Sequence, residues 1–290
     1  MFLKLVKHEF RSTRKGMLIM MVMILVMCVI NFFMPMTLRS DLDVSNGVGR
    51  AMLISVILFW TFLYMVVLIG VSITANIFVA IRFYRSMFTH EGYLTHTLPV
   101  SHHQLLWSKT LVSYIWLELL GLLMTLTAGT LAIGLVKQTA PLDVQRELAE
   151  ILGYFLKHFT LEIILFVVAM LLAPLAFILC IYACLALGQR FHNKVLASIL
   201  IFVGFLLVYG LINSVSTVMI QQIAAERITS YMQSAPYSSN MGYQISQMLN
   251  ENLPFLFNAS SLTSIVRATI WGLIGYLILA ANVKKHLNLD

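Results

Sequence analysis

Long apolar runs follow one another along most of the chain, separated by shorter polar segments. Each run reaches or exceeds the roughly 20 residues that an α-helix needs to cross the hydrocarbon core of a bilayer. The runs are continuous and do not alternate between apolar and polar residues, so they predict helices and not the strands of a membrane barrel. We expect six spans, at about 17–38, 51–81, 110–136, 159–188, 195–220 and 262–283.

The composition supports a protein that lies in a membrane. Of the residues, 60% are hydrophobic and only 11% are charged, whereas about 25% are charged in a typical soluble domain. These values predict an all-α polytopic membrane protein, in which residues 16–290 form one six-span domain. The net charge of +7 does not indicate nucleic-acid binding, because the basic residues are scattered at the ends of apolar runs and are not interleaved with aromatic residues.

The distribution of Lys and Arg predicts the orientation of the chain, because basic residues are enriched in cytoplasmic segments. If the N-terminus is inside, 12 of the 19 Lys and Arg residues fall in inner segments and 7 in outer ones. Both termini are therefore expected in the cytoplasm. The outer segments would be 39–50, 137–158 and a large polar loop at 221–261.

The first 15 residues have the pattern of an amphipathic helix. Its apolar positions fall on one face and its basic positions on another, and such a helix lies in the headgroup layer of a membrane. The alternative is a disordered basic anchor. The apolar positions are Leu3, Val6 and Phe10, and the basic ones are Lys4, Lys7, Arg11 and Arg14.

The inner segment 82–109 reads RFYRSMFTHEGYLTHTLPVSHHQLLWSK and is longer than a simple turn requires. Gly92 interrupts its apolar stripe, and Pro99 must end any helix before it. Ser101 and Gln104 have the spacing of a capping box, so the third spanning helix should begin at Ser101. The pattern favours a short helix, a sharp turn and a long helix, a shape that suits docking to another protein. An ordinary structured loop is the alternative.

Within this segment, GYLTHTLPVSHHQLLWSK resembles the first cytoplasmic loop of permease subunits of type-II ATP-binding-cassette exporters, of the six-span bacterial type. In that family a GYL-x-x-TLPVS-like segment joins the second and third spans. The elbow helix at 1–15, the six spans and the outer loop at 221–261 also match the family layout. The resemblance implies a multi-pass subunit of the cell membrane that pairs with a second permease subunit, identical or different, and with separate ATPase subunits.

The resemblance also implies roles for individual residues. A coupling helix that contacts the ATPase would contain Thr89, His90, Glu91, Gly92, Tyr93, Leu94, Thr95 and His96. A lever junction would follow it at Pro99, Ser101 and Gln104. The chain contains no G-x-x-x-x-G-K-[ST] phosphate loop, so we expect a transport subunit that is not an enzyme and binds no cofactor, with ATP and magnesium on the partner ATPase. Peptide, lipid, drug and polysaccharide substrates all fit this description.

A secondary transporter or channel that does not use ATP is the alternative function, and a membrane-embedded enzyme or assembly factor is a third. A transporter of this kind needs ionisable groups inside the membrane. Glu118, in the third span, is the candidate, either lining a pathway or pairing with a neighbouring helix. The histidines have no metal-binding spacing, so no metal site is expected. Cys180 and Cys184, four residues apart, are expected as small apolar side chains in a helix interface.

Overall fold

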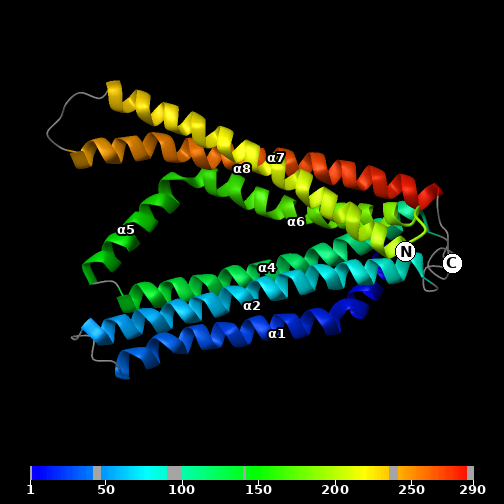
Figure 1. Cartoon of the computed structure of the whole chain (residues 1–290), viewed down its shortest axis with the longest axis horizontal. Helices are drawn as coiled ribbons and strands as arrows, with labels where there is room; N and C mark the ends of the chain where they lie inside the picture. The colour runs from blue at the N-terminus through cyan, green and yellow to red at the C-terminus, as the bar shows by residue number, and fades with distance from the viewer. Residues whose placement is uncertain (1, 42–46, 90–99, 140–141, 235–240, 286–290) are drawn as a thin grey trace. The chain divides into compact units, whose positions relative to one another are not determined.

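A computed structural model describes residues 2–41, 47–89, 100–139, 142–234 and 241–285. Within these residues every regular element is a helix and no strand occurs. In chain order the helices are α1 (Phe2–Asp41), α2 (Gly47–Phe88), α4 (His102–Thr139), α5 (Leu142–His158), α6 (Thr160–Gly188), α7 (Lys194–Ser234) and α8 (Met241–Lys285) (Figure 1).

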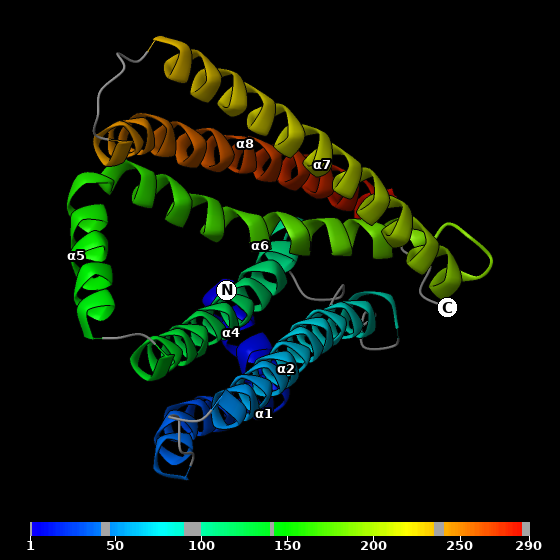
Figure 2. The same ribbon diagram turned by 60° about the vertical axis from the view of Figure 1, so that its left-hand side comes forward.

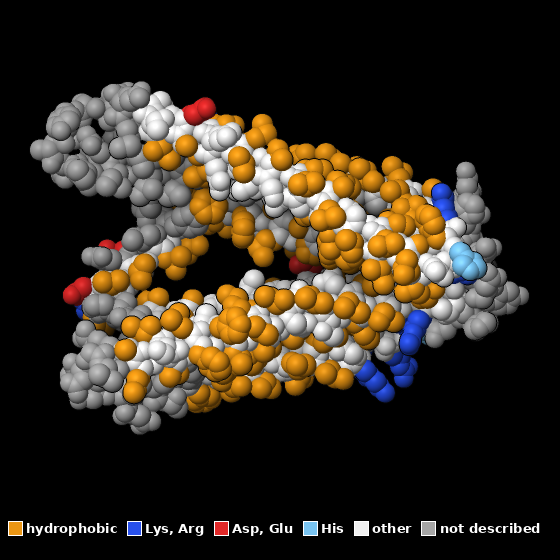
Figure 3. All heavy atoms as spheres, in the orientation of Figure 1, with side chains coloured by type: hydrophobic (Ala, Val, Ile, Leu, Met, Phe, Trp, Pro, Cys, Tyr) orange, Lys and Arg blue, Asp and Glu red, His pale blue; other side chains and the backbone are white. Residues whose placement is uncertain are grey.

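All of these helices except α5 are long and apolar enough to cross a membrane, which makes six candidate spans among the described residues. Their sides carry many exposed aliphatic and aromatic side chains (Figure 3), as expected of surfaces that contact lipid. The all-α fold with six spans is therefore confirmed. At about 1.5 Å per residue, α1 is roughly 60 Å long, about twice the hydrocarbon thickness. Such a helix extends well beyond the bilayer core.

The helices group into two compact units, the first made mainly of residues 1–152 and the second of residues 153–288. In the first unit, α4 packs mainly on α1, and α2 contacts both. In the second, α6 packs mainly on α8, and α7 contacts both.

Polar side chains join the helices of the first unit inside their apolar surroundings. Trp60 Nε1 in α2 donates a hydrogen bond to Asn31 Oδ1 in α1, at 2.9 Å. The hydroxyls of Tyr64 in α2 and Thr127 in α4 lie 2.8 Å apart. Because lipid offers no alternative partner, such bonds hold spanning helices together.

Small side chains allow the closest helix contact in the second unit. A Cβ added to Gly275 in α8 would lie only 3.0 Å from the carbonyl carbon of Leu179 in α6. Cys180 and Cys184 are both buried in α6, and Cys180 Sγ lies 3.4 Å from the backbone oxygen of Trp271 in α8. The prediction that Cys180 lies in a helix interface is confirmed.

Several helices have boundaries that the sequence patterns did not predict. Residues 2–15 of the amphipathic segment belong to the same continuous helix as the first span. Most of the predicted outer loop 221–261 is helical, because α7 continues to Ser234 and α8 begins at Met241. Residues 221–234 contain neither Gly nor Pro, so nothing in them ends a helix that has already formed.

The amphipathic segment after the third span forms its own helix, α5, separate from α6 (Figure 2). The break falls at Phe159, whose backbone φ of −109° and ψ of 38° depart from helical values. Apolar side chains of α5 remain exposed, among them Leu148, Leu152 and Leu156. A helix with such a face suits the membrane interface.

Candidate functional site

A cluster of buried charges joins three helices at the end of the first unit that contains the N-terminus of α1. Lys109 Nζ in α4 donates a hydrogen bond to Glu9 Oε1 in α1. Arg82 Nε in α2 lies 4.0 Å from Glu9 Oε2. The side chains of Lys109 and Glu9 are only 3% and 13% exposed, so the pair is largely removed from water. Removing either partner would deprive the other, buried side chain of this close counter-charge.

Aromatic contacts extend this cluster by about one helical turn. Trp116 Nε1 in α4 donates to Thr13 Oγ1 in α1 at 3.0 Å, and the Trp116 ring stacks on Phe10 with centroids 4.6 Å apart. The Thr13 hydroxyl in turn donates to the backbone oxygen of Glu9 at 3.0 Å. Phe10, predicted to face the headgroup layer, therefore contacts α4, and the start of α1 is fixed to α4. We call Glu9, Arg82 and Lys109, together with Phe10, Thr13 and Trp116, the anchor cluster.

Arg82 and Lys109 of the anchor cluster lie about two helical turns from the ends of α2 and α4 between which the predicted coupling segment runs in the chain. Thr89 comes directly after α2, and its hydroxyl donates to the backbone oxygen of Arg85. The other predicted coupling residues, His90–His96, and Pro99 of the lever junction lie outside the described residues.

The predicted start of the third spanning helix is confirmed. The backbone N–H of Gln104 donates to Ser101 Oγ at 3.3 Å. Helix α4 begins at His102, directly after Ser101. Ser101 is thus the N-cap of α4. The reciprocal contact from the Gln104 side chain stays a prediction.

The anchor cluster was not predicted as a site from the sequence, although one signal for it exists. Glu9 is the only acidic residue among the first 40, and five Lys and Arg residues surround it in the first 15. A single acidic residue in a basic segment could have suggested an ion pair with a basic residue of another helix. Lys109 and Arg82 were interpreted only as charges that orient the chain, because no sequence pattern relates residues so far from Glu9 in the chain.

Glu118 lies in α4, and its carboxylate forms a hydrogen bond with the Tyr114 side chain one turn earlier in the same helix. Its Oε1 atom is buried without a hydrogen-bond partner among the described residues. The partner identified for this carboxylate thus lies in its own helix, and the pairing with a neighbouring helix stays a prediction. Whether Glu118 lines a transport pathway stays a prediction.

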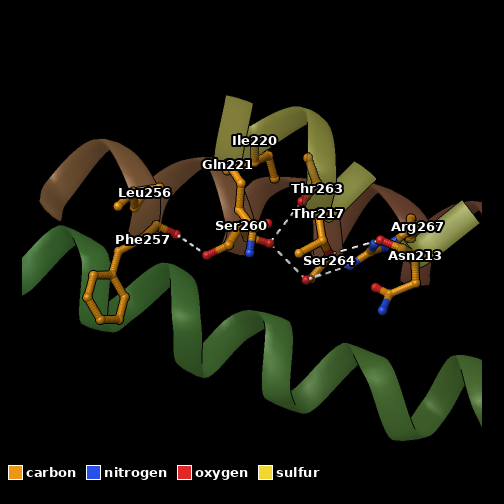
Figure 4. Close-up of a pocket in the computed structure, with 10 residues that line it drawn as sticks. All are labelled: Asn213, Thr217, Ile220, Gln221, Leu256, Phe257, Ser260, Thr263, Ser264 and Arg267. Carbon is orange, nitrogen blue, oxygen red and sulfur yellow. Dashed lines mark hydrogen bonds between the residues drawn. The ribbon is translucent and has the colours of Figure 1, made fainter. Parts of the chain in front are cut away.

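The second unit contains a pocket between α7 and α8, with a volume of about 430 Å³. Side chains of both helices surround it (Figure 4). The charged residue is Arg267, whose Nη1 donates to Ser216 Oγ at 2.6 Å and whose Nη2 donates to Ser264 Oγ at 3.1 Å. The pocket is lined by Asn213, Thr217, Ile220, Gln221, Leu256, Phe257, Ser260, Thr263, Ser264 and Arg267. The sequence patterns did not single out this pocket.

The fold and its apolar helices define the class: the chain is an all-α polytopic membrane protein. No protein-family model matches the chain, and no curated protein or solved structure is significantly similar to it. In the part of the chain that the structure describes, no group of His, Cys, Asp and Glu has the arrangement of a metal site.

Proposed function

We propose that the chain is the permease subunit of an ATP-driven exporter in the cell membrane. It would act with a second permease subunit, identical or different, and with ATPase subunits that bind ATP and magnesium. The resemblance of GYLTHTLPVSHHQLLWSK to the exporter loop suggests this function. The observation that carries it is the anchor cluster, which joins α1 to α2 and α4, the two helices that precede and follow the proposed docking segment in the chain.

A fixed junction at this place suits force transmission. A docking segment attached to independently moving helices would lose the motion of the ATPase in local bending. Here the Glu9–Lys109 pair and the Thr13–Trp116 hydrogen bond connect α4 to α1, and Arg82 lies beside Glu9. Closure of the ATPases on ATP would then move the first unit as one lever. That movement would change access to the transport pathway.

The competing function is a secondary transporter or channel, with Glu118 as its ionisable group. The buried Oε1 without a partner is the observation that favours it, because such groups mark ion and proton pathways in membranes. The two functions differ in their energy source. Vanadate should stop transport by an ATP-driven exporter, whereas an uncoupler that collapses the ion gradient should stop a secondary transporter.

The orientation can be tested by single cysteines placed at exposed serines that are predicted to lie on opposite sides of the membrane. We expect a membrane-impermeant maleimide added to whole cells to label Ser230→Cys, near the end of α7, and not Ser12→Cys, in α1. The wild type, whose cysteines Cys28, Cys180 and Cys184 all lie inside spans, is the control. Labelling of Ser12→Cys and not of Ser230→Cys would show that the orientation is the reverse of the predicted one.

The ATPase partner can be tested by purification of the tagged chain from its native membranes in mild detergent. We expect a polypeptide with a phosphate-loop sequence and vanadate-sensitive ATPase activity to copurify in a defined ratio. Leu94→Pro should abolish this association, because Pro removes a backbone donor and costs about 3 kcal/mol or more in a helix.

Leu148→Pro in α5 is the matched control, because the same substitution then lies in a helix predicted on the opposite side of the membrane. Both variants should reach normal membrane levels. If the ATPase copurifies with Leu94→Pro in the same ratio as with the wild type, the docking site lies elsewhere in the chain. If no ATPase copurifies with the wild type, the proposed function is wrong.

A further inference from the structure

The guanidinium of Arg267 in the pocket between α7 and α8 lacks a negative partner. Its two hydrogen-bond acceptors, Ser216 and Ser264, are neutral, and its Nε atom is buried with no partner. Among the described residues, no carboxylate lies within ion-pair distance of it. A cation inside a spanning helix is costly unless something neutralises it, so the site as it stands is electrostatically incomplete.

The surrounding hydroxyls orient Arg267 and do not compete with it for an anion. Ser216 and Ser264 each donate their own proton to a backbone oxygen of their helix, of Asn213 and of Ser260 respectively. Their lone pairs are thereby left to accept from the guanidinium, which holds its planar fork in place. Nη1 and Nη2 each carry two N–H groups, and the serines use one of each. The other two remain available to a ligand in the pocket that Arg267 lines.

Two amide side chains provide further donors in the same pocket. Asn213 and Gln221, both in α7, line it together with Arg267 (Figure 4). A fixed guanidinium with neighbouring N–H donors matches the oxygens of a phosphate group, which arginine binds through parallel charge-assisted hydrogen bonds.

The position of the pocket indicates that the anion belongs to a membrane amphiphile. The helical rise places Asn213 about 28 Å from Lys194 along α7, and Arg267 about 27 Å from Lys285 along α8, close to the roughly 30 Å thickness of a hydrocarbon core. The pocket therefore lies where headgroups meet acyl chains, at the end of the core opposite these lysines. The lining of the pocket itself includes Ile220, Leu256 and Phe257, which provide an apolar surface for acyl chains.

We propose that this pocket binds the phosphate headgroup of an anionic membrane amphiphile, with Arg267 as the main ligand and Asn213 and Gln221 as further donors. Ser216 and Ser264 are positioning residues. Binding of this kind requires neither ATP nor the ATPase, so the inference goes beyond the proposed transport function and can be tested on the full chain alone.

The test is a titration of the purified full-length chain in detergent, followed by native mass spectrometry and by the thermal unfolding midpoint. The probes are short-chain phosphatidylglycerol, diacylglycerol with the same chains, and inorganic phosphate. We expect phosphatidylglycerol to bind and to raise the midpoint, and diacylglycerol to do neither. Arg267→Gln should weaken phosphatidylglycerol binding at least tenfold, and Arg267→Lys should weaken it less, because lysine keeps the charge and loses the planar fork.

Arg227→Gln is the matched control, because Arg227 also lies in the second unit but contacts the Phe255 ring at 3.9 Å from its centroid and does not line the pocket. It should bind phosphatidylglycerol like the wild type. If Arg267→Gln does not fold, Ser216→Ala with Ser264→Ala should still reduce binding several-fold through loss of orientation. Equal binding by the wild type and by folded Arg267 variants would overturn the proposal. Inorganic phosphate that binds as tightly as phosphatidylglycerol would also overturn it, since the ligand would then be a soluble anion.

Discussion

Lys109→Met is expected to destabilise the chain by up to about 3–5 kcal/mol, the cost of breaking a buried ion pair. Glu9 loses its closer partner and keeps Arg82, whose Nε lies 4.0 Å from Glu9 Oε2, as a counter-charge. Glu9 would remain largely buried in α1 after its Lys109 partner is gone. Methionine keeps most of the length and apolar volume of the lysine stem, so the loss reports the charge and not a cavity. The measurement is the thermal unfolding midpoint of the purified chain, which should fall clearly below that of the wild type.

A double-mutant cycle separates the pair from the two side chains taken alone. Glu9→Gln alone should also be destabilising, whereas Glu9→Gln with Lys109→Met should recover part of the loss because the pair is then removed as a whole. Lys7→Met, at an exposed position of the same helical segment, is the control and should change stability by no more than about 0.5 kcal/mol. Additive effects of the two single substitutions would show that Glu9 and Lys109 are not energetically coupled.

The spans could be predicted because the membrane imposes a composition on every residue that crosses it. Where the helices end could not be predicted in the same way. Hydropathy marks where the chain leaves the lipid, but a helix can continue into water where the sequence contains no signal that stops it. For this reason α7 extends past the predicted boundary at 220 to Ser234. Pro254 lies inside α8, although a loop was expected there.

Local contacts were predictable and distant ones were not. The N-cap at Ser101 depends on residues three positions apart, and its pattern is legible in the sequence. The Glu9–Lys109 pair joins residues 100 positions apart, and the bond from Arg267 to Ser216 joins residues 51 positions apart. Asparagines in spans illustrate the same limit. Asn31 accepts a bond from a neighbouring helix, whereas Asn76 donates to Ser72 within its own helix.

The packing of α6 on α8 is expected to weaken when Gly275 gains a side chain. The Cβ of Gly275→Ala would lie 3.0–3.1 Å from backbone atoms of Leu179 and Cys180, and backbone cannot rotate away as a side chain can. The two helices must separate, and overpacking of this kind costs about 1–3 kcal/mol. Gly275→Leu should cost more and lower the membrane level of the chain. Thermal unfolding of the purified variants measures the difference.

Gly272→Ala is the matched control, because Gly272 lies one turn earlier in α8 and faces the same helix. Its added Cβ would meet the Ala176 side chain at 3.5 Å, an ordinary contact distance. Both alanine variants gain the same helix propensity, about 1 kcal/mol relative to glycine, so their difference isolates the contact with α6. Gly275→Ala should therefore unfold at a clearly lower temperature than Gly272→Ala. Equal midpoints would mean that α6 and α8 do not approach each other this closely at Gly275, and that small residues are not what allows these helices to pack.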